Sequence, residues 1–238
     1  MSDPVPGQQI INDGAVLTDG DRIVAVGERN SVLSNLIPAK ADQSIQESVD
    51  CGGGLLLPGL IDCHTHLVFA GDRAREFEQR LEGLSYEEIS RQGGGIRSTV
   101  TATRQSSEET LRAAAYKRAA RMCANGVTTL EVKSGYGLNL DDEQKMLLVA
   151  QSLQNLLPVS VHSTFLGAHA IPEEFLGYSD DYVDLVCEEM LPLVAAQKIA
   201  NSFDAFCETI AFSTTQVRKV FEKARSLSLP VRLHADQL

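Results

Sequence analysis

Short apolar runs alternate with longer amphipathic segments along most of this chain. Runs of strand length occur at 127–132, 159–165, 203–207 and 231–234, and an earlier run at 55–61 precedes them. Each run has the length and β-branched content expected of a buried strand. Strands that alternate with helices in this way predict a parallel sheet packed against helices.

Capping residues locate the starts of three helices. In each case an oxygen-bearing side chain is followed three residues later by Glu or Gln, the spacing of a capping box. The pairs are Ser106 with Glu109, Asp141 with Gln144, and Ser213 with Gln216. They predict a helix that carries Leu111 to Met122 and ends at Gly126, and two more helices near 142–155 and 214–227.

The first fifty or so residues show a different pattern. Apolar segments at 16–17 and 23–26 flank an Asp-Gly pair, Asp19 and Gly20, which predicts a β-hairpin. We therefore interpret residues 1–54 as part of a small β-sandwich domain and residues 55–238 as part of a larger α/β domain.

The strands of the larger domain suggest a barrel. A (β/α)8 barrel has eight strands, with its active site at their C-terminal ends, whereas about five strands are predicted here. The expected fold class is thus α/β: a partial (β/α)8 TIM-type barrel, about five of eight strands, with part of a small N-terminal β-domain. Because the sequence stops just after the fifth strand, we expect a truncated form of a longer protein.

Composition narrows the class of protein. The chain has 238 residues and a net charge of −11, which argues against nucleic acid or an anionic membrane as partner. It has no apolar run of transmembrane length and no signal-peptide pattern at its start. The five cysteines are scattered without a Cys-x-x-Cys pair, which favours reduced thiols in a cytoplasmic protein. We expect Cys63 to pack in the core.

Two histidines mark the C-terminal end of the first strand. Side chains at i and i+2 of a strand share a face, so His64 and His66 should project together, roughly 6 to 7 Å apart. His234, at the end of the fifth strand, is the natural third ligand of a metal site with an open position. The alternatives are a solvent-facing pair and a hydrogen-bonded core histidine, and for His162 we favour the latter.

Longer motifs resemble a known family. The segment 57–66 is similar to the metal-dependent amidohydrolase superfamily, and further segments resemble, within it, the imidazolonepropionases of histidine degradation. These segments are VFAGDR at 68–73, GGGI at 93–96, EVKSGYG at 131–137, TFLGAH at 164–169 and HADQ at 234–237. The resemblance runs from about Asp13 to Leu238.

The resemblance implies an enzyme that hydrolyses the ring C–N bond of 4-imidazolone-5-propanoate to N-formimidoyl-L-glutamate by a metal-activated water. It implies one divalent or trivalent ion, Zn or Fe. By position, the metal ligands are His64, His66 and His234, and the substrate-binding residues are Arg73, Tyr136, His169 and Gln237, with Tyr86 as a further candidate. An Arg and a Tyr hydroxyl suit the propionate carboxylate.

The full-length protein could form a homodimer, which the sequence does not decide.

Other interpretations of these residues remain. Arg73 could be a solvated surface charge, and Tyr136 could be an aromatic in a turn. We interpret Lys133 as an ordinary residue at a strand end. The glycines at 93–95 are not a phosphate loop, because no strand precedes them and no Gly-Lys-Ser/Thr follows.

Two competing functions are considered. One arises because residues of the family lie beyond this sequence, and the other because related enzymes share the three histidines. Family members draw a further His and a metal-binding Asp from strands beyond Leu238, so no catalytic residue is certain here and we expect negligible turnover from residues 1–238 alone. One alternative is a related amidohydrolase deaminase of a nitrogen heterocycle, which would not need Arg73 and Tyr136. The other is an inactive metal-binding fragment or partner-binding module.

Overall fold

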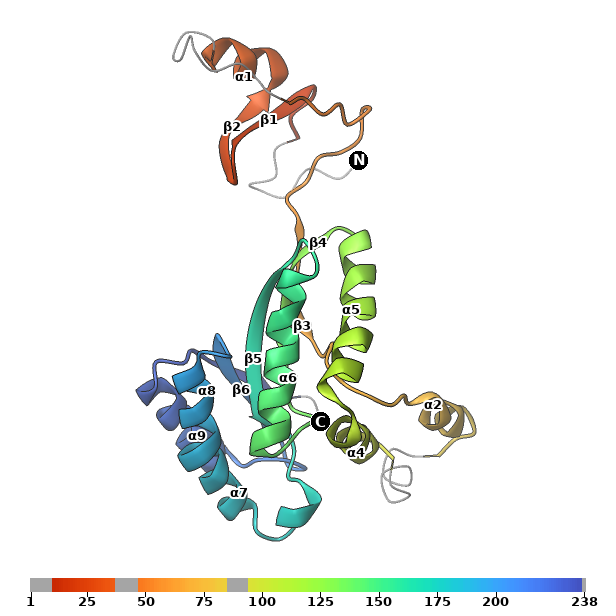
Figure 1. Cartoon of the computed structure of the whole chain (residues 1–238), viewed down its shortest axis with the longest axis vertical. Coiled ribbons are helices and arrows are strands. Elements are labelled where there is room, and N and C mark those ends of the chain that lie inside the picture. The colour runs from red at the N-terminus through yellow and green to blue at the C-terminus, as the bar shows by residue number, and fades with distance from the viewer. Residues whose placement is uncertain (1–9, 37–46, 85–93, 237–238) are drawn as a thin grey trace. The chain divides into compact units, whose positions relative to one another are not determined.

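The computed structural model describes residues 10–36, 47–84 and 94–236 (Figure 1). The chain divides into two compact units, Met1–Pro58 and Gly59–Leu238. The functional candidates all belong to the second unit.

The first unit contains the hairpin predicted from the Asp-Gly pair. Strands β1 (Gly14–Asp19) and β2 (Arg22–Glu28) pair antiparallel. Gly20 lies in the turn at φ 58°, a conformation that glycine adopts without strain. Helix α1 (Arg29–Leu36) follows directly. The small antiparallel sheet is confirmed, and its membership of a β-sandwich stays a prediction.

The second unit is built on a curled five-stranded parallel sheet. Its order is the order of the sequence, β3-β4-β5-β6-β7. The strands are β3 (Leu60–Thr65), β4 (Val127–Lys133), β5 (Ser160–Ala168), β6 (Ser202–Cys207) and β7 (Val231–Ala235). The predicted parallel α/β sheet is therefore confirmed. The order has no reversal of the kind that defines a doubly wound sheet.

Helices connect the strands of the sheet. They are α2 (Ala74–Leu81), α4 (Ile96–Gln105), α5 (Glu108–Ala124), α6 (Leu140–Ser152), α7 (Ser179–Leu185), α8 (Leu191–Gln197) and α9 (Thr214–Ser226). A π-helical turn, Val186–Met190, joins α7 to α8, and 3-10 turns lie at Leu153–Asn155 and Glu173–Phe175. Of these helices, α5, α6 and α9 pack directly on the strands. Because parallel crossovers are right-handed and all advance in one direction, these helices lie on the same face of the sheet (Figure 1).

Strand alternation separates an apolar face from a polar one. On β4, Leu130 and Val132 are fully buried in the cluster formed with α5 and α6. On β6, Phe203 and Ala205 are fully buried in the cluster formed with α7, α8 and α9. Residues between them point to the opposite face of the sheet, and that face carries the charged and polar side chains described below.

Two of the three helix caps differ from the sequence prediction. Ser213 and Gln216 form the predicted capping box at α9. At α5, however, it is Ser107 rather than Ser106 that accepts the hydrogen bond of the third amide. At α6 the cap is Asn139, whose side chain accepts from the Asp142 amide. The predicted Asp141 instead lies in the first turn, where a carboxylate favours the helix dipole.

The first strand of the sheet starts later than the apolar run predicts. Residues Leu55, Leu56 and Leu57 form no strand and are 75%, 57% and 60% exposed. β3 begins at Leu60 and pairs only with β4 among the described strands. Cys63 is exposed, so its predicted core packing is wrong. Alternation fixed the face of Cys63 but not whether anything packs against that face.

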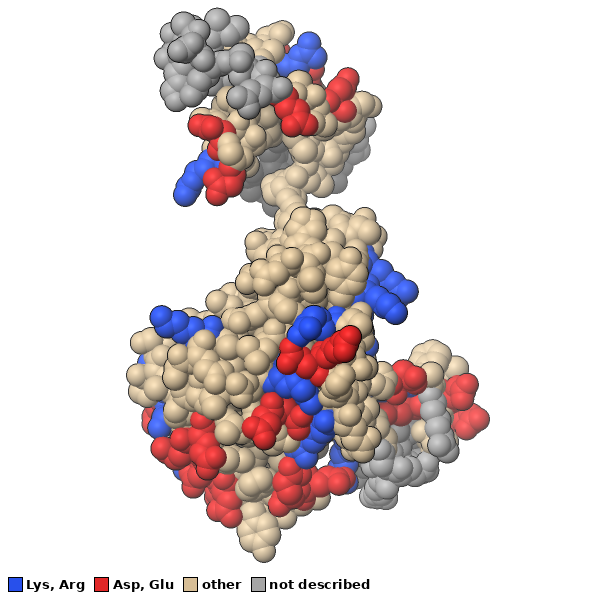
Figure 2. Space-filling model, viewed as in Figure 1, with Lys and Arg blue, Asp and Glu red and all other residues tan. Residues whose placement is uncertain are grey.

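Charges of both signs are interspersed on the helices of the second unit in the view of Figure 2. Lys219 and Lys223 of α9 form ion pairs with Asp184 and Glu188. In the described part of the chain, no helix has the length and apolar character needed to cross a lipid bilayer.

Candidate active site

Four histidines and one tyrosine from four strands or strand ends form a contiguous cluster. The ring centroids of His64 and His66 are 5.7 Å apart, and those of His64 and His234 are 4.5 Å apart. His66 stacks on His169 at 5.2 Å and contacts Tyr136, also at 5.2 Å. Residues up to 170 positions apart in sequence thus meet, because each follows or ends a strand of the same curled parallel sheet.

His64 and His66 are in the neutral protonation state that binds a cation. The Nε2 atoms of His64 and His234 lie 3.0 Å apart. Burial and the neighbouring His169 lower the pKa of His66 to about 3, and burial with His234 lowers the pKa of His64. Both rings are therefore neutral at pH 7, the form that binds metals. Among the described residues, the buried Nδ1 of His66 has no hydrogen-bond partner.

The three rings are neighbours, but their nitrogens do not converge on one point. Within the described residues, no three His, Cys, Asp or Glu side chains already converge with the spacing of a metal site. The donor chemistry nevertheless fits Zn or Fe, because it offers neutral imidazoles and an unused buried nitrogen.

His169 is fixed in one tautomer by the backbone. Its Nδ1 lies 2.9 Å from the carbonyl oxygen of Gly135. A carbonyl only accepts, so Nδ1 carries the proton and Nε2 keeps its lone pair. Burial lowers the pKa of His169 to about 4, which keeps the ring neutral. Its Nε2 can therefore accept a hydrogen bond from a ligand.

Arg73 and Tyr136 line one pocket. The pocket has a volume of about 390 Å³, and its other lining residues are Phe69, Gly71, Asp72, Thr99 and Arg118. Arg73 Nε donates to Thr99 Oγ1 over 3.2 Å, while its side chain remains 43% exposed. Burial raises the pKa of Tyr136, an effect that the charge of Arg73 opposes. A guanidinium and a phenol hydroxyl thus share a pocket beside the histidine cluster.

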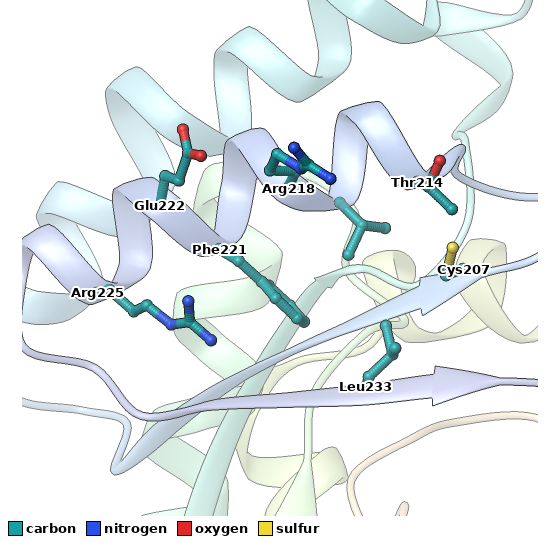
Figure 3. Close-up of a pocket in the computed structure, with 8 residues that line it drawn as sticks. Cys207, Thr214, Arg218, Phe221, Glu222, Arg225 and Leu233 are labelled. Carbon is teal, nitrogen blue, oxygen red and sulfur yellow. The ribbon is translucent and has the colours of Figure 1, made fainter.

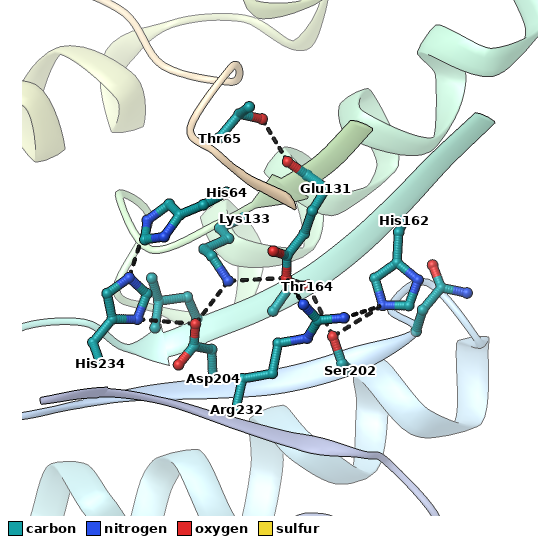
Figure 4. Close-up of polar contacts among 12 residues, drawn as sticks. His64, Thr65, Glu131, Lys133, His162, Thr164, Ser202, Asp204, Arg232 and His234 are labelled. Atoms are coloured by element: carbon teal, nitrogen blue, oxygen red, sulfur yellow. Dashed lines mark hydrogen bonds and ion pairs between the residues drawn. The ribbon is translucent and has the colours of Figure 1, made fainter. Parts of the chain in front are cut away.

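The structure also reveals a buried ion-pair network beneath the histidines (Figure 4). Lys133 Nζ donates to Glu131 Oε1 over 2.9 Å and to Asp204 Oδ2 over 2.8 Å. All three side chains are at most 4% exposed. Lys133 ends β4, as predicted, but it is a buried and doubly paired residue rather than an ordinary one.

Asp204 connects this network to the histidine cluster. Its Oδ2 lies 2.9 Å from His234 Nδ1 as well as near Lys133. Burial alone would raise the pKa of Asp204, but the contacts with His234 and Lys133 outweigh it and lower that pKa. Asp204 is thus ionised at neutral pH and sits behind the candidate metal ligand of β7.

The polar face continues away from the histidines. Arg232 NH1 lies 3.2 Å from Glu131 Oε1, which also accepts from the Thr164 hydroxyl at 2.6 Å. His162 Nε2 lies 3.2 Å from Ser202 Oγ. His162 is half-buried and hydrogen-bonded, apart from the other four histidines.

A second hollow, of about 430 Å³, lies between α9 and the ends of β6 and β7 (Figure 3). Phe221 and Leu233 line it together with Arg218. Because Leu233 and His234 are consecutive on β7, they point to opposite faces of the sheet. This hollow is therefore on the helix-covered side and not part of the histidine cluster.

Two predicted site residues, Tyr86 and Gln237, lie outside the described residues. The residues that sequence reasoning missed are Glu131, Asp204 and the buried role of Lys133. A signal for them exists: charged residues inside otherwise apolar strands are rarely buried unless they are paired. The sequence does not show, however, which charge pairs with which.

Several known proteins that are similar to this chain share one name, imidazolonepropionase. The chain is 53% identical over 229 residues to an imidazolonepropionase of Pseudomonas entomophila, covering 96% of this chain and 55% of the relative. Identity is 53% over 230 residues with an imidazolonepropionase of Yersinia pseudotuberculosis (97% and 55%), and 52% over 228 residues with one of Pseudomonas putida (96% and 55%). No family model matches the chain.

The chain spans about half the length of the curated relatives it matches. Within that half, the likeness extends over 96% of this chain. Over almost its whole length, this chain is therefore a relative of the imidazolonepropionases.

Proposed function

We propose that the protein hydrolyses the ring C–N bond of 4-imidazolone-5-propanoate to N-formimidoyl-L-glutamate in histidine degradation. The observation that carries the proposal is the 53% identity to imidazolonepropionases across 96% of this chain. The pocket shared by Arg73 and Tyr136 supports it, because a substrate with a propionate needs such a site.

The proposal assigns a Zn or Fe ion to His64, His66 and His234. Their support is the neutral state of His64 and His66 and the 3.0 Å separation of the His64 and His234 nitrogens. When bound, such an ion supplies Lewis acidity, which polarises a carbonyl and acidifies a water molecule. The protein's part is to keep His64 and His66 neutral and to place the three rings beside one another.

The substrate side of the proposal uses the neighbouring pocket. Arg73 pairs with the propionate carboxylate, and the Tyr136 hydroxyl donates a second hydrogen bond to it. His169 accepts a hydrogen bond from a ring N–H through Nε2, since its Nδ1 is occupied by Gly135. Gln237 is assigned to the ring's polar edge from the motif alone. Together these contacts orient the ring carbonyl toward the histidines.

The proposal extends to the whole protein in three ways. The five parallel strands are part of a (β/α)8 barrel, as their unreversed order supports. Cysteines without a disulfide among the described residues support a cytoplasmic location. A homodimer remains open for the full-length protein.

Incubating the full-length protein with 4-imidazolone-5-propanoate tests the activity directly. We expect loss of the ring absorbance and formation of N-formimidoyl-L-glutamate, dependent on added Zn or Fe. The competing deaminase function predicts ammonia release from guanine or cytosine instead. A protein that deaminates either base and leaves the imidazolone intact would rule out the proposed reaction.

Replacing Arg73 with alanine should raise KM for the imidazolone substrate strongly. The variant loses a charge-assisted hydrogen bond to the carboxylate, an interaction of about 1.5–3 kcal/mol, or roughly 10- to 150-fold in kcat/KM. Steady-state kinetics of the full-length variant measure the change.

Arg97 provides a matched control for this substitution. Its side chain is 44% exposed, close to the 43% of Arg73, and it pairs with Glu173 outside the pocket. Arg97→Ala should leave KM unchanged. Equal KM values for both variants and the parent would mean that Arg73 is a solvated surface charge.

A further inference from the structure

One loop connects β4 to α6 and supports both Tyr136 and His169. Tyr136 belongs to the loop, while the Gly135 carbonyl oxygen holds His169 Nδ1 at 2.9 Å. Gly135 has φ +103°, and a Cβ there would lie 2.8 Å from that nitrogen. Only glycine allows this close approach. The position of two proposed substrate contacts therefore depends on the shape of one short loop.

A single buried carboxylate holds the loop in this shape. Glu143, in the first turn of α6, is 1% exposed. Its Oε1 accepts from the amides of Gly137 at 2.8 Å and Leu138 at 2.9 Å, and both of its oxygens lie 3.1 Å from the Gly135 amide. Three backbone donors of one loop thus converge on one side chain.

The buried Glu143 carboxylate accepts hydrogen bonds from the amides of this loop. Among the described residues it forms no ion pair with a Lys or Arg, although burying an unpaired carboxylate is costly. Burial raises its pKa, while hydrogen bonds from Ser134 and the loop amides act in the opposite direction. These loop donors are what compensates the buried carboxylate.

The loop is also held from its outer side. Arg104 Nε donates to the Gly137 carbonyl at 2.6 Å, and its NH2 donates to the Leu138 carbonyl at 3.3 Å. Arg104 satisfies the carbonyls and Glu143 satisfies the amides, so the backbone from Gly135 to Leu138 is fixed on both sides. Glu143 is the member of this pair that also contacts Gly135, the residue that orients His169.

We propose that Glu143 is a positioning residue for the substrate pocket: by binding the Gly135, Gly137 and Leu138 amides, it sets Tyr136 against His66 and keeps His169 in its Nδ1-protonated tautomer. Glu143 touches neither substrate nor metal in this assignment. The identity of the ligand rests on the proposed function, but the effect on the loop and on His169 does not.

Nitrogen NMR of the full-length protein labelled with 15N-histidine tests the proposal without any substrate. In the parent protein we expect His169 to be protonated on Nδ1 and unprotonated on Nε2. In Glu143→Gln, the remaining oxygen can still accept from the Gly137 and Leu138 amides, but an NH2 replaces the other oxygen and faces the Gly135 amide. The loop should therefore relax at Gly135, and the His169 tautomers should become mixed. A parent His169 protonated on Nε2 overturns the proposal, as does a folded Glu143→Gln variant with an unchanged tautomer.

Kinetics give a second readout. Displacing a pocket side chain by about 1 Å can cost up to ~100-fold, so we expect kcat/KM of Glu143→Gln to fall about 10- to 100-fold with the melting transition still cooperative. In a Tyr136→Phe background the same change should have a smaller effect, because both act on one contact. Fully additive losses in the double variant contradict the assigned route.

Asp142→Asn is the matched control. Asp142 is adjacent on α6 and is also an acid in the first turn, but its oxygens contact Lys145 and Asn139 rather than the loop amides. It should change neither the His169 tautomer nor kcat/KM. The same disturbance from Asp142→Asn would mean that the charge of the helix start matters and not the loop contacts, which overturns the proposal.

A second variant and a readout that needs no substrate complete the test. If Glu143→Gln does not fold, Gly137→Ala disturbs the same contact from the loop side, because its Cβ would lie 2.4 Å from the Glu143 amide nitrogen. The same shift of the His169 tautomer is then required. If the parent enzyme does not open the imidazolone ring, the proposed function fails, whereas the NMR result still decides the role of Glu143.

Discussion

His66→Ala in the full-length protein is expected to lose its bound metal and nearly all ring-opening activity. His66 is the central ring of the cluster, in contact with His64, Tyr136 and His169. Changing partners that only support metal ligands typically costs about 10- to 100-fold, so losing a ligand should cost more than about 100-fold in kcat. Metal analysis of the dialysed protein and steady-state kinetics measure both effects.

His162 is the matched control for this substitution. It is a strand histidine of the same polar face, but its partner is Ser202 and it lies apart from the cluster. His162→Ala should retain one metal ion per chain. Stoichiometric metal in His66→Ala would show that the ion is bound elsewhere, and the assignment of the three ligands would then be wrong.

Of the substitutions proposed for this protein, Lys133→Met is expected to lower the free energy of unfolding the most. The substitution keeps much of the side-chain volume but removes the cation shared by Glu131 and Asp204, which are 4% and 1% exposed. Removing one partner of a buried ion pair typically costs about 3–5 kcal/mol. Glu131 keeps its contact with Arg232. The decrease in the free energy of unfolding should therefore lie at the lower end of this range, about 3 kcal/mol.

Lys219→Met separates this effect from the loss of any ion pair. Lys219 pairs with Asp184 at the surface, where the two side chains are 52% and 55% exposed. Such exposed pairs contribute little to stability, because water and salt screen the two charges. Urea unfolding of both full-length variants gives the comparison. A Lys133→Met protein as stable as Lys219→Met would mean that the buried carboxylates are accommodated without the lysine.

Much of the fold could be predicted because its signals are local. The strands near 127–132, 159–165, 203–207 and 231–234 were each visible as short apolar runs and are present within a few residues of those bounds. The hairpin followed from the Asp19-Gly20 turn. Errors arose at boundaries: the apolar residues 55–57 resemble a strand, but they have no pairing partner and remain exposed.

Caps show the same limit on a smaller scale. Ser106 and Ser107 are both suitable caps for α5, and the sequence does not distinguish them. The structure selects Ser107, whose hydroxyl accepts from the Thr110 amide, while the Ser106 hydroxyl donates to the Ala102 carbonyl of α4. The choice depends on how the preceding helix ends, which capping rules for one helix do not include.

The candidate site divides along the same line. The sequence by itself determined the alternation of strands and helices, the pairing of His64 with His66 on one strand, and the likeness to imidazolonepropionases. Only the tertiary structure decided that Lys133 pairs with Asp204, 71 residues away, that Cys63 is exposed, and that Glu143 holds the loop of Tyr136. The physical reason is that periodicity and motifs report a residue's own segment, whereas burial and ion pairing depend on which strands lie side by side and in what register.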